Sequence, residues 1–264
     1  MFLDITFMIT VGIAAMLLLA SGFLLLMMVV QRKKWLLEKQ MSQLKEYQQN
    51  QLIEAAVKSE EGERHRIAEQ LHDEVGAILS STRLHFLNIK DASLDEKDKI
   101  LFEKSKELLN ESVQKIRNIS HNLHSSLLKE FGLNEAIRHF VAKTIQGELI
   151  KTETDLDEKY LIQNPQTDMG VYRIVQELVN NILKHARSNS IKFSSRVENN
   201  TLKLILEYTG SGLSQKEFEE LRYQPDGLGL KNIMNRIILL KGDIVYEKSY
   251  DFNTIILTIP INEE

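Results

Sequence analysis

A histidine followed by two acids, His72-Asp73-Glu74, stands in the middle of the amphipathic run "RIAEQLHDEVGAIL" (66–79). An imidazole near neutral pH can move a proton or act as a nucleophile, and an adjacent carboxylate can assist it. A histidine beside an apolar seam can also serve only in packing. Other residues of the chain are therefore needed to distinguish a chemical role for His72 from a packing role.

A second polar set lies in "QELVNNILKHA" (176–186), where Glu177 and Asn181 are four residues apart and share one helix face, with Lys184 on the next turn. A carboxylate, a carboxamide oxygen and an ammonium suit a hydrated Mg²⁺ that carries a polyphosphate. A solvated polar face is the alternative. Asn180 and Asn181 argue against it, because asparagine is a poor helix former.

Glycines form the third set, "GSG" (210–212) and "GLGLKN" (227–232), and the second group precedes the amphipathic run "LKNIMNRIILL". Glycines that lead into a helix N-terminus let backbone N–H groups close on phosphate oxygens. The spacing of a Walker loop is absent, and no parallel βαβ unit surrounds the group, which excludes a dinucleotide fingerprint.

Long helices must position the histidine, since the three prolines leave the first 164 residues without any. Residues 31–61 are rich in Gln, Glu, Lys and Leu and predict a continuous helix or coiled coil. Apolar residues then recur in steps of three and four over 67–89 and again over 109–127, with the polar break "DASLDEKDK" (91–99) between. Such a hairpin cannot bury both apolar faces alone, so we expect a homodimeric four-helix bundle.

An uncharged run from Ile5 to Val30 is long enough to cross a bilayer. Arg32, Lys33 and Lys34 follow it, with Trp35 at headgroup level, so the chain after Gln31 is expected to face the cytoplasm. A cleaved signal peptide fits poorly, because the run is too long and its positive charges come after it. Because few residues would lie outside the membrane, we expect the input signal to enter through the bilayer or through a partner membrane protein.

The C-terminal part predicts a separate α+β domain, with a mixed sheet covered by helices on one face. Asn199 and Asn200 in "VENNTL" predict a hairpin turn. Helical patterns cover 130–140, 168–187 and about 228–241. The β-rich runs are "LIKTETD", "IKFSSRV", "TLKLILEY", "DIVYEKS" and "TIILTIP".

Composition excludes several classes of protein. The 264 residues include no cysteine, which removes disulfides, thiolate metal sites and a cysteine nucleophile. The net charge is −4 with 27% charged residues, so overall electrostatics gives no sign of direct nucleic-acid binding.

Taken together, the three sets resemble the sensor histidine kinases, and in particular the subfamily with an "ER-x-RIA-x-x-LHD" signature, here "ERHRIAEQLHD" (63–73). "QELVNNILKHA" looks like the family's N box and "GLGLKN" like its second glycine box. The resemblance implies a mainly α part followed by an α+β sandwich. The expected parts are a transmembrane anchor (1–30), a signalling helix (31–62), a dimerization and phosphotransfer domain (63–128) and a catalytic ATP-binding domain (129–264).

The same resemblance implies that His72 takes the γ-phosphoryl group of ATP, with Asp73 orienting its ring, and passes it to an aspartate of a response regulator with a helix-turn-helix output domain. Asn181 is expected to hold Mg²⁺. A single-pass protein of the bacterial inner membrane is implied. The expected nucleotide contacts are Glu177, Asn181, Lys184, His185, Tyr208, Gly210, Gly212, Gly227, Gly229 and Leu230.

Two residues depart from the family pattern. The family has an aspartate two residues before the first glycine of "GSG", where it binds the adenine amine, and this chain has Tyr208. Ala77 stands where many members have a glutamine that orients water for dephosphorylating the regulator. An inactive pseudokinase scaffold is therefore the main alternative to a kinase. A conformational ATPase of the same superfamily would not need His72.

Overall fold

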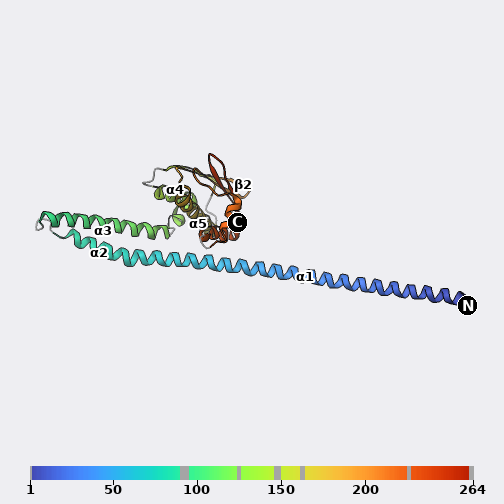
Figure 1. Cartoon of the computed structure of the whole chain (residues 1–264). Helices are drawn as coiled ribbons and strands as arrows, with labels where there is room; N and C mark the ends of the chain where they lie inside the picture. Colours follow the sequence, from blue (N-terminus) through green and yellow to red (C-terminus); the bar gives the residue numbers. More distant parts are fainter. Residues whose placement is uncertain are drawn as a thin grey trace. The chain divides into compact units, whose positions relative to one another are not determined.

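The computed structural model describes residues 2–89, 95–123, 126–145, 150–160, 164–224 and 227–261 (Figure 1). The chain divides into two compact units, Met1–Leu52 and Ile53–Glu264, and each is described by itself. One helix, α1 (Phe2–Gln70), runs through the first unit and into the second. The helix predicted for residues 31–61 is therefore confirmed, and no proline interrupts it.

The apolar N-terminal stretch lies within α1. Among the described residues, one helix is long and apolar enough to cross a membrane, with a window of mean hydropathy 1.6 that is not buried. Length and composition alone support a span here.

A helical hairpin follows α1. A π-helical turn (Leu71–Val75) leads into α2 (Gly76–Leu87), and α3 (Glu96–Leu123) lies beside it (Figure 1). Asp95 caps α3, since its carboxylate accepts from the Asp98 backbone N–H at 2.7 Å. The predicted break between two helices is confirmed, although residues 90–94 of that segment lie outside the described residues.

The hairpin buries only part of its apolar surface. Val113 and Ala68 are buried, and the Ser120 hydroxyl donates to the Ala68 carbonyl at 2.9 Å, which ties α3 to the end of α1. Ile78 is 65% exposed, and Leu84 and Leu108 are exposed as well. One hairpin thus leaves an apolar face uncovered, as the four-helix-bundle prediction requires.

The C-terminal domain, residues 126–261, is built on one mixed sheet with strand order β1-β2-β3-β5-β4. β1 pairs with β2 in parallel, and the other three pairings are antiparallel. The five predicted strands are confirmed as β1 (Lys151–Asp155), β2 (Ser190–Glu198), β3 (Thr201–Tyr208), β4 (Asp243–Glu247) and β5 (Asn253–Pro260). Its helices are α4 (Ser126–Thr144), α5 (Pro165–Asn181), α6 (Gln215–Leu221) and α7 (Leu228–Leu239).

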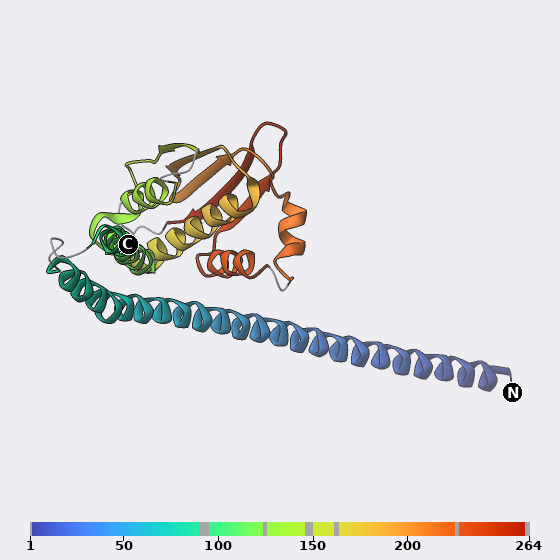
Figure 2. The same ribbon diagram turned by 60° about the vertical axis from the view of Figure 1, so that its left-hand side comes forward.

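Figure 2 shows α4, α5 and α7 on one side of this sheet, as the sequence predicted. Helix α5 is the central element of the layer: Ile174, Val175, Leu178 and Val179 are almost completely buried. Buried and more exposed residues alternate along the strands, so that Leu202, Leu204 and Leu206 of β3 face the same core. Sheet and helices therefore share one hydrophobic core.

Local sequence also fixes the turns. Asn199 and Asn200 have φ values of 49° and 56°, which confirms the predicted hairpin between β2 and β3. Helix α6 was missed by the sequence patterns. It is held by a capping box in which the Ser214 hydroxyl accepts from the Glu217 backbone while the Glu217 carboxylate accepts from Ser214.

Gly210 follows β3 with φ 91°, and a methyl group there would lie 2.1 Å from the Ala186 carbonyl oxygen. Gly210→Ala is therefore expected to destabilise the C-terminal domain by about 1–3 kcal/mol from the strained backbone alone. Urea unfolding followed by circular dichroism would measure the loss.

Gly170→Ala is the matched control. The atoms nearest to its methyl would be those of the Leu240 side chain, the closest at 3.1 Å. Gly170 also lies inside the regular helix α5, where alanine is favoured over glycine by about 1 kcal/mol. A Gly210→Ala protein as stable as Gly170→Ala would show that the turn after β3 can rearrange.

Candidate nucleotide-binding and phosphoacceptor sites

A hollow of about 510 Å³ opens between α5, the start of α7 and the ends of β3 and β4. Helix α6 and the segment that follows it contribute Leu221 and Gln224 to the wall. The hollow brings together nine of the predicted nucleotide contacts. They are Glu177, Asn181, Lys184, His185, Tyr208, Gly212, Gly227, Gly229 and Leu230.

The polar face of α5 meets the start of α7 at one side of this hollow. A methyl group on Gly229 would lie 2.2 Å from Glu177 Oε1 and 3.7 Å from Asn181 Nδ2. Only a glycine lets the α7 backbone come this close to the two side chains. The first turn of α7 presents N–H groups without helical partners, which favour phosphate oxygens.

The residues present also fit a Mg²⁺ ion that is carried by a polyphosphate. Mg²⁺ keeps several waters and takes few protein ligands, and Asn181 offers a carboxamide oxygen at the α5 end of the hollow. Among the described residues there is no group of three His, Asp or Glu side chains that could hold a metal by themselves. A metal here would need the phosphates as its main ligands.

The other glycines also stand where side chains would collide. A methyl on Gly227 would lie 2.0 Å from the Leu221 carbonyl oxygen, and one on Gly212 would lie 2.0 Å from Asn253 Oδ1. Gly210 does not line the hollow. Its carbonyl accepts from Asn253 Nδ2 at 2.9 Å, so it shapes the turn that carries Gly212.

A second π-helical turn, Ile182–Ala186, ends α5 and carries Lys184 and His185. Both side chains are exposed at the edge of the hollow. The Ala186 carbonyl accepts from the Ser211 backbone N–H at 2.8 Å, which joins this turn to the "GSG" segment. Single π turns recur at functional sites, and this one redirects the basic pair toward the nucleotide hollow.

Two phenols, Tyr208 and Tyr246, line the end of the hollow at β3 and β4, and both side chains are almost fully buried. Burial raises the pKa of the Tyr208 hydroxyl, partly opposed by a hydrogen bond from the Leu213 backbone. The Tyr246 ring stacks on Phe218 at 4.5 Å, and among the described residues its hydroxyl has no hydrogen-bond partner. This end therefore offers neutral hydroxyls and no carboxylate.

His72 lies elsewhere, in the first π-helical turn, and lines a separate hollow of about 340 Å³ on the helical hairpin. Arg117 of α3 shares that hollow and puts a positive charge beside an exposed imidazole. Asp73 is exposed, and no hydrogen bond between described residues joins it to His72, so its orienting role stays a prediction. The hollow is lined only by residues of the hairpin.

Sequence reasoning missed Arg117 and Tyr246. Arg117 lies on α3, 45 positions after His72, and belongs to no motif. Tyr246 lies in a strand whose alternation predicts burial but not contact with the hollow. Their roles depend on the packing of distant segments, which no local pattern in this chain records.

The structure thus places a glycine-walled hollow on the α/β layer of the C-terminal domain and an exposed histidine on the helical hairpin. Residues 63–128 match the family model described as histidine kinase, and residues 166–263 match the one for histidine kinase-, DNA gyrase B- and HSP90-like ATPases. The chain belongs to the sensor histidine kinases.

Three curated relatives are similar over most of this chain. Sensor histidine kinase MctS of Rhizobium johnstonii is 25% identical over 221 residues, which cover 79% of this chain and 45% of the relative. Signal transduction histidine-protein kinase/phosphatase DegS of Brevibacillus brevis is 24% identical (79% and 54%). Oxygen sensor histidine kinase NreB of Staphylococcus carnosus is 24% identical (81% and 61%). The chain thus spans about half the length of the curated relatives it matches.

The buried Tyr246 hydroxyl, which has no hydrogen-bond partner among the described residues, should lower the stability of the nucleotide-free protein. A buried hydroxyl without a partner costs about 1–3 kcal/mol. Tyr246→Phe is therefore expected to raise the stability of the nucleotide-free protein by about 1 kcal/mol, as measured by urea unfolding. Tyr208→Phe is the control and should lower stability instead, because the Tyr208 hydroxyl accepts from Leu213. Destabilisation by Tyr246→Phe would show that ordered water satisfies the hydroxyl.

Proposed function

We propose that this protein is a membrane-anchored sensor histidine kinase that phosphorylates His72 from ATP and then transfers the phosphoryl group to an aspartate of a response regulator. One observation carries the proposal. A glycine-walled hollow faces the polar side of α5, in a chain that also presents an exposed histidine beside Arg117. The ATPase family match supports ATP as the nucleotide.

The proposed reaction uses two sites, the nucleotide hollow and the hollow that His72 lines. Backbone N–H groups at the start of α7 bind phosphate oxygens, and Lys184 adds positive charge at the edge of the hollow. Asn181 is the residue we assign to Mg²⁺, which when bound screens the charge of the phosphates. Positioning supplies most of the rate in such transfers.

At the phosphoacceptor, a lone pair of His72 Nε2 forms the bond to the γ-phosphorus as the bond from that phosphorus to the β,γ-bridging oxygen breaks. Asp73 accepts the Nδ1–H hydrogen bond during transfer, which fixes the tautomer and offsets the positive charge of the ring. Arg117 faces the incoming phosphoryl group from α3. The phosphoryl group then moves from His72 to the carboxylate of the regulator.

The surroundings of these sites support a dimer held in a membrane. The apolar face left on the hairpin fits a second copy of this chain. The apolar window of α1, followed by Arg32, Lys33 and Lys34, supports a single pass through the bacterial inner membrane with the kinase part in the cytoplasm.

The scaffold alternative rests on Tyr208 and has no support from the three relatives, which are all named as kinases. The loss of a charge-assisted hydrogen bond to the adenine amine weakens binding by about tenfold to a hundredfold. The glycines and Asn181, which face the phosphates, are untouched by that change. We therefore infer weak but productive ATP binding, with little discrimination between adenine and guanine.

His72→Gln should abolish acid-labile, base-stable labelling of the full chain by γ-labelled ATP, because no other residue can donate the Nε2 lone pair at that position. His85→Gln is the control: His85 is exposed on α2, outside both hollows, and its loss should leave labelling intact. Binding of a non-hydrolysable ATP analogue should be the same in both variants. Persistent label on His72→Gln would assign the phosphoacceptor elsewhere.

Asn181→Ala should abolish Mg²⁺-dependent labelling for a different reason, by removing the carboxamide that faces the phosphates. Asn180→Ala is a close control, because Asn180 is the neighbouring residue on α5 and faces away from the nucleotide hollow. Calorimetric titration with the ATP analogue, with and without Mg²⁺, would measure the difference. Normal Mg²⁺-dependent binding by Asn181→Ala would contradict this assignment.

A further inference from the structure

Two tyrosines, Tyr208 and Tyr246, line the end of the nucleotide hollow that lies at β3 and β4, which we call the tyrosine end. Their side chains lie on either side of β5, because Tyr208 pairs with Asn253 and Tyr246 pairs with Ile255. Successive side chains of a strand point to opposite faces, so these four residues share one face of the sheet. Both phenols are therefore held by the sheet at the same end of the hollow.

The Tyr246 ring is fixed in place. It stacks on the Phe218 ring of α6 with 4.5 Å between the centroids, and the Tyr246 backbone N–H donates to Gln215 Oε1 at 2.9 Å. Its hydroxyl is nevertheless buried without a hydrogen-bond partner among the described residues. Because the ring cannot swing toward bulk water without losing the stack, a molecule that enters the hollow is the partner open to this hydroxyl.

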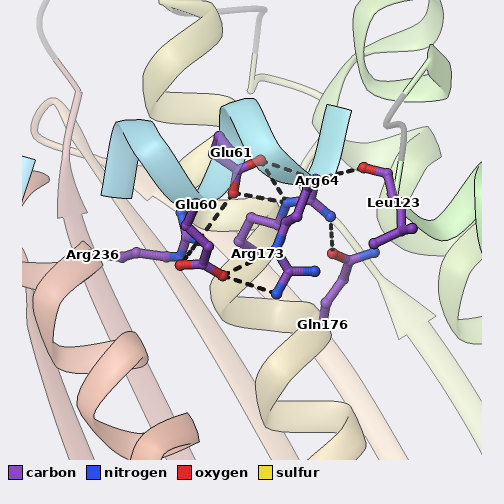
Figure 3. A network of polar contacts seen from close by, with 7 residues as sticks. All are labelled: Glu60, Glu61, Arg64, Leu123, Arg173, Gln176 and Arg236. Carbon is purple, nitrogen blue, oxygen red and sulfur yellow. Dashed lines mark hydrogen bonds and ion pairs between the residues drawn. The ribbon is translucent and has the colours of Figure 1, made fainter. Parts of the chain in front are cut away.

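This unpaired hydroxyl contrasts with the other buried polar groups. Figure 3 shows the buried Arg173 guanidinium, which donates to the Glu61 carboxylate and to the Gln176 amide oxygen. Among the described residues, only Arg222 Nε and the Tyr246 hydroxyl are buried side-chain atoms of this kind without a partner. Arg222 does not line the nucleotide hollow, whereas Tyr246 does. The exception therefore coincides with the site where a ligand is expected.

The Tyr208 hydroxyl presents a proton to the hollow. Its oxygen accepts from the Leu213 backbone N–H, so its own O–H is left to donate. Burial raises the pKa of both phenols, so both stay protonated and neutral at physiological pH. Among the described residues that line the hollow, Glu177 is the only acid, and it lies beside Gly229 instead. The tyrosine end therefore offers hydrogen-bond donors and no negative charge.

The 6-position of a purine decides which base fits such an end. Adenine carries an amine there, which donates, beside the acceptor N1. Guanine and hypoxanthine carry the carbonyl O6, which accepts, beside a donating N1–H. A carboxylate only accepts hydrogen bonds and therefore selects the amine. A phenol whose oxygen already accepts one hydrogen bond selects the carbonyl, and the unpaired Tyr246 oxygen suits the neighbouring N1–H.

We propose that the tyrosine end recognises the 6-carbonyl group of a purine, with Tyr208 donating to O6 and Tyr246 accepting from N1–H, so that ITP and GTP bind more tightly than ATP. The proposal rests on the proposed kinase function and names the bases that its nucleotide site prefers. Loss of the carboxylate alone leaves little discrimination, and the two phenols add a preference in the opposite direction. ATP remains a phosphoryl donor, held through its phosphates. Uracil presents the same pair of groups on a smaller ring, but the ATPase family match favours a purine.

Calorimetric titration of the full chain with the β,γ-imido analogues of ITP and ATP tests the assignment, because the two bases differ only at position 6 and in the proton on N1. With Mg²⁺ present, the wild type should bind the ITP analogue about threefold to tenfold more tightly, as expected for one neutral hydrogen bond. Tyr208→Phe should bring the ratio of the two affinities close to one, and Tyr208→Asp should reverse it. A ratio measured on one protein does not depend on how much of that protein is folded.

Two further tyrosine variants complete the test. Tyr246→Phe should weaken binding of the ITP analogue more than binding of the ATP analogue, because it removes the acceptor for N1–H, although it stabilises the empty protein. Tyr250→Phe is the matched control. Tyr250 is fully exposed in the loop after β4 and does not line the hollow, so its variant should keep the wild-type ratio.

Two results would overturn the assignment: equal or tighter binding of the ATP analogue by the wild type, or a preference for the ITP analogue that survives Tyr208→Phe. Tighter binding of the UTP analogue than of the ITP analogue would overturn it in favour of uracil. Labelling separates the assignment from the kinase function. A protein that prefers the ITP analogue, yet labels His72 with neither γ-labelled ATP nor γ-labelled GTP, would keep the base assignment and refute the kinase function. Failure of both analogues to bind at millimolar concentration would refute both.

Discussion

The arrangement of this protein depends on one buried cation, the guanidinium of Arg173. It cannot lose its charge, so its burial requires the Glu61 carboxylate, the Gln176 amide and the Leu123 carbonyl in fixed directions. These partners come from α1, α5 itself and the end of α3. Glu177 and Asn181 follow Arg173 by one and two turns of the same rigid helix. The geometry of this one guanidinium therefore fixes how the nucleotide site faces the hairpin that carries His72.

Much of the fold could be predicted from the sequence, because local physics decides it. The strands of the C-terminal domain follow their alternation, the β2–β3 hairpin follows Asn199 and Asn200, and α7 starts directly after Gly227. Helix α6 was missed although its capping box, Ser214 with Glu217, can be read in the sequence. Its seven residues hold too few apolar positions for a periodic pattern to register.

The site was predicted less completely, for physical reasons. Motif spacing placed Glu177, Asn181 and Gly229 in one hollow, because all three act through helix faces and helix ends. The π-helical turns at His72 and Lys184 could not be predicted, since shifting one hydrogen bond along the helix leaves no mark in the sequence. The choice of Glu61 as partner for Arg173 could not be either, because the chain holds 37 acidic residues and tertiary packing selects among them.

In the proposed kinase the two ends of the nucleotide hollow have different roles, which would let the chain bind ATP with Tyr208 in place of the carboxylate expected from the family resemblance. At the phosphate end the essential feature is backbone that comes close, and Gly227 and Gly229 provide it through the absence of a side chain. At the other end, Tyr208 and Tyr246 form an apolar wall with neutral hydroxyls. In the proposed kinase, discrimination between bases would depend on that end, whereas transfer would depend on holding the γ-phosphate. We therefore expect a change at position 208 to alter which nucleotide binds, and how tightly, without removing the geometry on which the proposed transfer depends.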